Sequence, residues 1–127
     1  MAFLSKYQPQ LLSILRIVAG LLFIEHGTQK IFHFPPMIMT IPPGAETIVM
    51  AAAWIELIGG ALIILGLFSR IAAFICSGEM AVGYWLVHFT KGGFFPAVNN
   101  GDAAILFCFV FLYLAASGPG PWSLNQK

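Results

Sequence analysis

The sequence predicts an all-α integral membrane protein, an antiparallel bundle of four transmembrane helices that forms one domain over residues 1–127. Composition is the first reason: 59% of the residues are hydrophobic and 9% are charged, whereas a soluble domain carries about 25% charged residues. The second reason is that the apolar residues form four runs, at about 10–32, 46–68, 70–90 and 102–118. Segments rich in Pro, Gly or Asn follow the first and third runs, and the short polar break Ser69-Arg70 follows the second. Runs of this length match a hydrocarbon core about 30 Å thick.

The first run is expected to organise the others, because it carries Arg16, Glu25, His26 and Lys30 in an otherwise apolar helix. Ionisable side chains at membrane depth are costly unless they have partners. The partners must come from the other runs. Glu25 lies nearly opposite Arg16 and Lys30 on a helix, so this helix is predicted to have neighbours on two faces.

Two stripes with the same spacing predict how the first two helices pack. Their residues follow one another at intervals of 4, 3, 4 and 3, which places each stripe on one helical face. The stripes are Arg16, Gly20, Phe23, Gly27 and Lys30 in the first run, and Glu56, Gly60, Ile63, Leu67 and Arg70 in the second. Glycines let helices approach closely, so antiparallel packing predicts that Glu56 contacts His26 or Lys30. Such a pair would either set the helix register or take part in a functional site.

The predicted topology gathers most ionisable residues in the outer half of the bundle. The candidate polar cluster comprises His26, Lys30, Glu56, His88, Asp102 and Glu25, with Lys91 at the same side. Helix packing is assigned to Arg16, Gly20, Gly27, Gly60 and Arg70, and no metal site is predicted. Simpler roles stay open for three residues, since Arg70 and Lys91 can extend to lipid headgroups and Asp102 can be a helix N-cap. Glu79 lies in mid-helix without an identified partner.

The two cysteines, Cys76 and Cys108, are predicted to be free thiols. In the expected topology their depths differ by roughly 10 Å, which is too far for a disulfide.

Lys and Arg in the flanks predict the orientation. Lys6, Arg70 and Lys127 belong to one membrane side, and Lys30 and Lys91 to the other, which favours cytoplasmic termini. The net charge of +1 provides no basic surface for nucleic acid.

The same residues, taken in order, resemble the DoxX family of small four-span bacterial and archaeal membrane proteins. The matching segments are 16–30, 56–70, Met80-Ala81 with His88, and 100–107 followed by 117–125. Two positions depart from the family pattern, because Asp102 stands where Glu is common and Asn125 where Asp is common.

The resemblance implies the cell (inner) membrane and the membrane component of a quinone-linked oxidoreductase or redox-stress and detoxification system. The chain shows no flavin, dinucleotide or iron–sulfur motif, so quinone is the one expected ligand and an electron-carrying cofactor would belong to a redox partner protein. A b-type haem between His26 and His88 is a minor alternative. A non-catalytic scaffold, assembly factor or chaperone is the alternative function, with the apolar, proline-rich segment 33–45 as a docking surface or a lid. Besides the lipid bilayer, a second copy of the chain is a candidate partner.

Overall fold

The computed structural model describes residues 1–37 and 41–127, which form helices and turns without a strand. The helices are α1 (Ala2–Ser5), α2 (Gln8–Phe32), α3 (Glu46–Leu65), α4 (Ser69–Gly83), the π-helix η1 (Tyr84–His88), α5 (Phe89–Gly92), α6 (Pro96–Asn99) and α7 (Asp102–Ser117). The predicted all-α class is confirmed.

Three helical stretches are long and apolar enough to cross a membrane: Gln8–Phe32, Glu46–Leu65 and the unbroken stretch Ser69–Gly92, which joins α4, η1 and α5. The fourth, α7, has 16 residues. At 1.5 Å per residue it is about 24 Å long, shorter than a typical hydrocarbon core. Gly101 precedes α7 and Gly118, at a φ of 84°, ends it.

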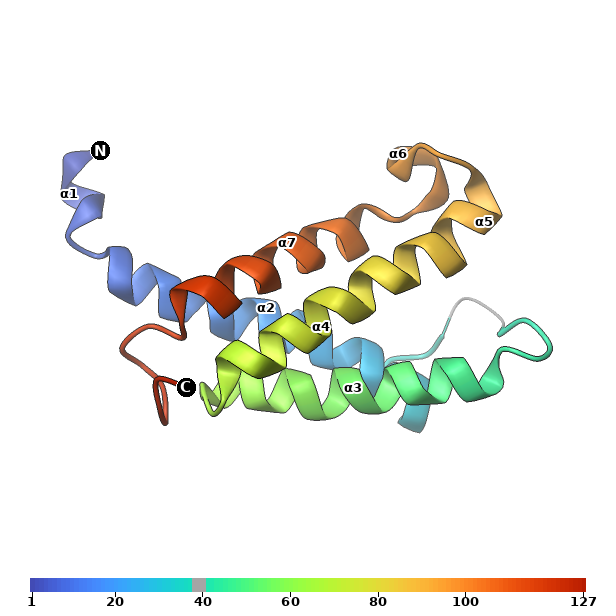
Figure 1. Cartoon of the computed structure of the whole chain (residues 1–127), viewed down its shortest axis with the longest axis horizontal. Coiled ribbons are helices and arrows are strands. Elements are labelled where there is room, and N and C mark those ends of the chain that lie inside the picture. Colours follow the sequence, from blue (N-terminus) through green and yellow to red (C-terminus); the bar gives the residue numbers. More distant parts are fainter. Residues whose placement is uncertain (38–40) are drawn as a thin grey trace.

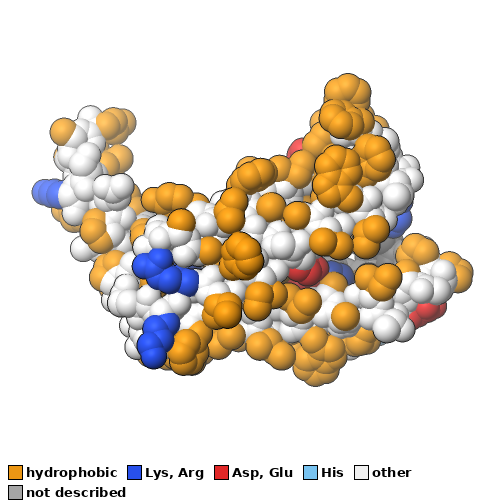
Figure 2. Space-filling model, viewed as in Figure 1, with side chains coloured by type: hydrophobic (Ala, Val, Ile, Leu, Met, Phe, Trp, Pro, Cys, Tyr) orange, Lys and Arg blue, Asp and Glu red, His pale blue; other side chains and the backbone are white. Residues whose placement is uncertain are grey.

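The helices pack as two pairs. α2 lies along α3, α4 lies along α7, and the pairs join through α3 and α4 (Figure 1). The pairs lie close together near the C-terminus and diverge toward the end where α3 begins and α5 and α6 lie (Figure 1). A space-filling view shows a hollow between these two arms (Figure 2). The outer surface is mostly hydrophobic side chains, as expected for helices that face lipid (Figure 2).

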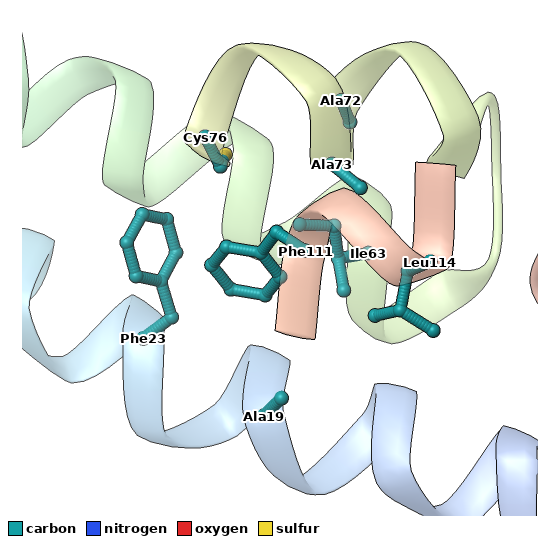
Figure 3. Packing of buried hydrophobic residues seen from close by; sticks show 8 residues of the cluster. All are labelled: Ala19, Phe23, Ile63, Ala72, Ala73, Cys76, Phe111 and Leu114. Carbon is teal, nitrogen blue, oxygen red and sulfur yellow. The ribbon is translucent and has the colours of Figure 1, made fainter. Parts of the chain in front are cut away.

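The hydrophobic core lies where the two pairs meet (Figure 3). Phe23 of α2 and Phe111 of α7 are fully buried and pack edge to face, with ring centroids 4.8 Å apart. Ile63, Ala73 and Cys76 fill the space from α3 and α4. Because small residues occupy most of the α4 surface here, its backbone comes close to the aromatic pair.

The contact between α2 and α3 depends on glycines, as the two stripes predicted. A Cβ atom on Gly27 would lie 2.9 Å from Leu57 N and 3.0 Å from Ala53 O. One on Gly60 would lie 2.9 Å from Ile24 Cβ. Side chains at these positions would therefore force the two helices apart.

The C-terminal segment, residues 118–127, crosses the bundle at the end where α3 and α7 finish, and backbone and side-chain hydrogen bonds hold it there. Leu124 N donates to Leu65 O at 3.2 Å, and Asn125 N donates to Gly66 O at 3.1 Å. The Asn125 side-chain oxygen accepts a hydrogen bond from Phe68 N at 3.0 Å. An amide oxygen thus fills the acceptor role at the position where the family commonly has Asp.

Two arginines hold the same segment. Arg16, which is 1% exposed, donates to the carbonyl oxygens of Pro119 and Trp122. Arg70 donates to Ala116 O at 2.7 Å and Gln126 O at 3.2 Å. Backbone carbonyls of α7 and of the C-terminal segment therefore bind the guanidinium of Arg70 within the chain.

Both cysteines are free, as predicted. The predicted depth difference between them is wrong, because Ser77 Oγ, next to Cys76, donates to Cys108 O at 2.7 Å. The connection before α7 turns back into the bundle, so that Gly101 lies against the ring of Tyr84. α7 therefore begins at the depth of Tyr84 and not at that of Lys91.

Replacement of Arg16 by alanine is predicted to lower the free energy of unfolding by about 3 kcal/mol, since buried carbonyls would lose a charged hydrogen-bond donor. The measurement is denaturant unfolding in detergent, followed by circular dichroism. Lys6→Ala, at an exposed position, serves as the control and should change stability by less than about 0.5 kcal/mol. Equal stability of the two variants would show that Arg16 does not hold the C-terminal segment.

Candidate functional site

The centre of the candidate site is an ion pair between α2 and α3. Lys30 Nζ lies 2.5 Å from Glu56 Oε1. The side chain of Glu56 is 1% exposed and that of Lys30 is 23% exposed. Of the two contacts that the stripes allowed for Glu56, the structure contains the one with Lys30.

Helix packing places this pair away from water. Gly27 brings α2 against the Glu56 turn of α3, where a Cβ on Gly27 would lie 3.2 Å from Glu56 Cβ. Lys30 follows Gly27 by about one turn and reaches across this close contact. Burial of one charge without the other would cost several kcal/mol, so the pair constrains the register of α2 against α3.

A second carboxyl group belongs to the site. Glu79 of α4 lies close enough to interact with both Glu56 and Lys30. One oxygen of each carboxyl group, Glu56 Oε2 and Glu79 Oε2, is buried with no hydrogen-bond partner in the described part of the chain. The sequence left Glu79 without an identified partner, and the structure places it near Lys30 of α2 and Glu56 of α3.

The side chains of Lys30, Glu56 and Glu79 contain more negative than positive charge and more hydrogen-bond acceptors than donors. Two carboxylates beside one ammonium group leave one negative charge uncompensated, which is unfavourable in a low-dielectric interior. The two unpaired carboxyl oxygens are acceptors. The Lys30–Glu56–Glu79 cluster can therefore take up a proton, or a ligand that donates a hydrogen bond.

His88 belongs to a different network, at the end of the bundle where α5 and α6 lie. Its Nδ1 lies 3.0 Å from Asn99 O, and its ring stacks near that of Tyr84. Asn99 is 6% exposed and donates to Tyr84 Oη at 3.1 Å and to Gly93 O at 2.8 Å. These contacts hold the connection between α5 and α7 against the π-helix η1. Sequence reasoning gave Asn99 no role, although a buried asparagine in a turn is a common backbone anchor.

Other members of the predicted cluster lie elsewhere. Asp102 is exposed in the first turn of α7 and is not the N-cap, which is Gly101. His26 packs edge to face on Phe107, with ring centroids 6.0 Å apart. Glu25 is exposed on α2, so the prediction that other helices of this chain cover both faces of α2 is wrong. The single chain covers one face, toward α3 and α7.

Two hollows lie outside the cluster. One, of about 260 Å³, lies between α3 and α4 and is lined by apolar side chains that include Trp54, Ile58 and Ile75. The other, of about 470 Å³, lies between the start of α2, the end of α7 and the C-terminal segment. Within residues 1–37 and 41–127, no three His, Cys, Asp or Glu side chains gather as a metal site would require.

Comparison with known proteins identifies the family. The model of the DoxX family matches residues 11–89, more than half of the chain. The chain belongs to the DoxX family. It is a membrane protein, as its three long apolar helices indicate.

The DoxX chain is similar over most of its length to three curated proteins. It is 45% identical to a Haemophilus influenzae protein named "Uncharacterized protein", over 98% of this chain and 95% of that one. It is 30% identical to "Inner membrane protein YphA" of Escherichia coli, over 94% and 91% of the two chains. It is also 30% identical to "Uncharacterized membrane protein Rv3486" of Mycobacterium tuberculosis, over 94% and 82%. No solved structure matches the chain significantly.

The part that matches the DoxX model contains the whole Lys30–Glu56–Glu79 cluster. It also contains His88. Asn99, Asp102 and the C-terminal segment lie beyond it. The cluster is therefore part of the region that identifies this chain as a DoxX protein.

Glu56→Ala is predicted to lower the free energy of unfolding of the DoxX chain by about 3–5 kcal/mol, because it breaks the ion pair between the fully buried Glu56 and Lys30 that joins α3 to α2. The double variant Glu56→Leu with Lys30→Met should be more stable than Glu56→Ala alone. Unfolding in detergent measures both, with Glu46→Ala as the control, since Glu46 is exposed in the first turn of α3. A double variant as unstable as the sum of its single variants would mean that the two residues do not interact.

Proposed function

We propose that this DoxX protein is the membrane component of a quinone-linked oxidoreductase or redox-stress and detoxification system, and that it binds a quinone headgroup at the Lys30–Glu56–Glu79 cluster. The observation that supports this proposal is the pair of unpartnered carboxyl oxygens beside one lysine, inside the membrane-spanning part of the chain. A quinone has two carbonyl oxygens that accept hydrogen bonds, and the corresponding quinol has two hydroxyl groups that donate them.

The cluster offers groups for both forms of such a ligand. Lys30, or a protonated carboxyl group, can donate to a quinone oxygen. Glu56 Oε2 and Glu79 Oε2 can accept a hydrogen bond from a quinol hydroxyl. Oxidation of a quinol to a quinone releases two protons and two electrons. The two carboxyl groups can receive the protons, and the electrons pass to a redox centre that a partner protein carries.

The hollow between the two arms gives a ligand a route to the cluster. α2 and α3 carry Lys30 and Glu56, while α4 carries Glu79. The cluster thus joins residues of both helix pairs, and these pairs diverge toward the end where α3 begins (Figure 1). A small, flat molecule that enters from the lipid or from the outer side would meet it there.

We further propose that the chain is a single domain with four antiparallel spans, α7 being the fourth, in the inner membrane with both termini in the cytoplasm. The name of the Escherichia coli relative, an inner membrane protein, supports the location. Lys and Arg side chains gather where α7 ends and the C-terminus lies (Figure 2), as expected for a cytoplasmic face.

A non-catalytic scaffold, assembly factor or chaperone is the second candidate. The Lys30–Glu56 contact favours it, because an ion pair with a fully buried glutamate holds two helices together without any ligand. The proposed docking segment, 33–45, exposes Phe34 at 74%. Its residues 38–40 lie outside the described part of the chain.

Binding of a decyl-substituted benzoquinone to the purified protein in detergent tests the proposal. Glu79→Gln removes one proton acceptor and should weaken binding of the quinol form at least tenfold, while helicity by circular dichroism stays unchanged. Glu46→Gln, at an exposed carboxylate outside the cluster, should bind like the unmodified chain. Two results would contradict quinone binding: an unmodified chain that binds neither form, or a Glu79→Gln variant that binds the quinol equally well. Either result would favour the non-catalytic scaffold, assembly factor or chaperone.

A further inference from the structure

The carboxyl groups of Glu56 and Glu79 come together across the contact between α3 and α4. At this contact Gly59 lies against Cys76, and a Cβ atom on Gly59 would clash with Cys76 Sγ. Only residues 66–68 separate α3 from α4, so the two helices run in opposite directions. Glu56 precedes Gly59 by three residues. Glu79 follows Cys76 by three, so both carboxyl groups lie about one turn beyond the contact and on the same side of it.

Burial leaves these two carboxyl groups with one positive charge beside them. Glu56 is 1% exposed, and Glu79 is partly buried. Lys30 Nζ takes up one oxygen of Glu56. The other oxygen of Glu56 and one oxygen of Glu79 are buried and accept no hydrogen bond from the described residues. Two ionised carboxyl groups are acceptors only, and their like charges repel where water is scarce, whereas a proton between them removes both problems.

We infer that Glu56 and Glu79 share one proton, and that this proton joins the two helix pairs at the cluster. With this proton, the charges of Lys30, Glu56 and Glu79 sum to zero. One carboxyl group then donates a charge-assisted hydrogen bond to the other, which is stronger than a hydrogen bond between neutral groups. Glu56 belongs to the pair α2–α3 and Glu79 to the pair α4–α7, so the hydrogen bond crosses the boundary between the pairs.

The titratable groups that face the two carboxyl groups in the described part of the chain come from α2 and α4. Lys30 of α2 and Cys76 of α4 lie close enough to interact with them. His26 of α2 packs on an aromatic ring of α7 instead, and Cys108 of α7 contacts Ser77. Among the groups that face the carboxyl pair, Lys30 is the cation, and Glu56 takes it up. A proton therefore supplies the second positive charge.

The shared proton makes the contact between the helix pairs sensitive to pH. High pH removes the proton and leaves two negative charges that repel across the boundary. The pairs, which already diverge toward the end where α3 begins (Figure 1), are then expected to move apart. This inference does not rest on the proposed function, because it concerns the chain without a ligand. Where a quinol binds, the resident proton has to leave before the two carboxyl groups can accept both of the quinol's protons.

Infrared spectroscopy of the purified protein in phosphatidylcholine vesicles at neutral pH tests for the proton, with ¹³C labels on the glutamate carboxyl carbons. The measurement uses a Glu25→Gln background, because Glu25 is the other glutamate within the α2, α3 and α4 spans apart from the first turn of α3. We expect the carbonyl band of a protonated carboxylic acid, shifted by the label. The band should disappear in Glu79→Gln and remain in the matched control Glu46→Gln. Absence of the band, or its survival in Glu79→Gln, would overturn the inference.

The distance between two spin labels tests whether the proton joins the helix pairs. In a background with Cys76 and Cys108 replaced by alanine, the substitutions Ile48→Cys and Val98→Cys provide the labelling sites. Ile48 of α3 is 61% exposed and Val98 of α6 is 70% exposed, and they belong to different arms of the bundle. The distance between the labels is expected to increase when the pH is raised from neutral to alkaline.

Two variants of this labelled chain separate the shared proton from other titrations. Glu79→Gln should keep the label distance short and independent of pH, because a carboxamide donates to Glu56 without titrating. His26→Gln is the matched control and should respond to pH like the labelled chain itself. A label distance that does not change with pH in the labelled chain, a change of equal size in Glu79→Gln, or a response that His26→Gln abolishes would overturn the inference.

Discussion

The buried contact between Lys30 and Glu56 is the interaction on which the rest of the structure depends. A charge pair within the membrane-spanning part of the chain tolerates little displacement, because separation of its members leaves each charge in a low-dielectric interior. Gly27 and Gly60 permit the close helix approach that the contact needs. Once α2 and α3 are in register, Glu79 of α4 comes beside the pair. The ion pair thus sets both the packing of two helices and the chemistry of the candidate site.

The two ends of the bundle use different means to satisfy polar groups. Toward the end where α2 finishes and α3 begins, acidic side chains gather around one lysine, and a carboxyl oxygen of Glu56 is left without a donor. At the end that carries the C-terminus, Arg16 and Arg70 bind backbone carbonyls and hold the C-terminal segment across the helices. Carbonyl groups satisfy a guanidinium without adding a negative charge. Hydrogen bonds within the chain therefore hold the end of the bundle near the C-terminus, while the Lys30–Glu56–Glu79 cluster keeps unpaired acceptors.

Sequence reasoning predicted the parts of this arrangement that follow from helical periodicity. The 4–3 spacing placed Lys30 and Glu56 on facing stripes, and the glycines marked the close contact. Helical periodicity could not place residues whose positions depend on how the connections between helices fold. The turn before α7, anchored by Asn99, shifts α7 inward by about two turns relative to the expected register, so the predicted depths of Cys108 and Asp102 were wrong. Glu79 had no predicted partner because its neighbours come from two other helices. The exposure of Glu25 depends on helix order around the bundle, which spacing alone does not determine.

The distance between the Lys30 side-chain nitrogen and the Glu56 carboxyl carbon, measured by solid-state NMR in lipid bilayers, tests the central claim most directly. Isotope labels on lysine nitrogen and glutamate carboxyl carbon, with Lys30→Met and Glu56→Leu samples to assign the signal, report the contact in the intact protein. The structure, with Lys30 Nζ at 2.5 Å from Glu56 Oε1, predicts a strong dipolar coupling that disappears in either variant. A coupling that is absent in the unmodified protein, or that survives in both variants, would contradict the account.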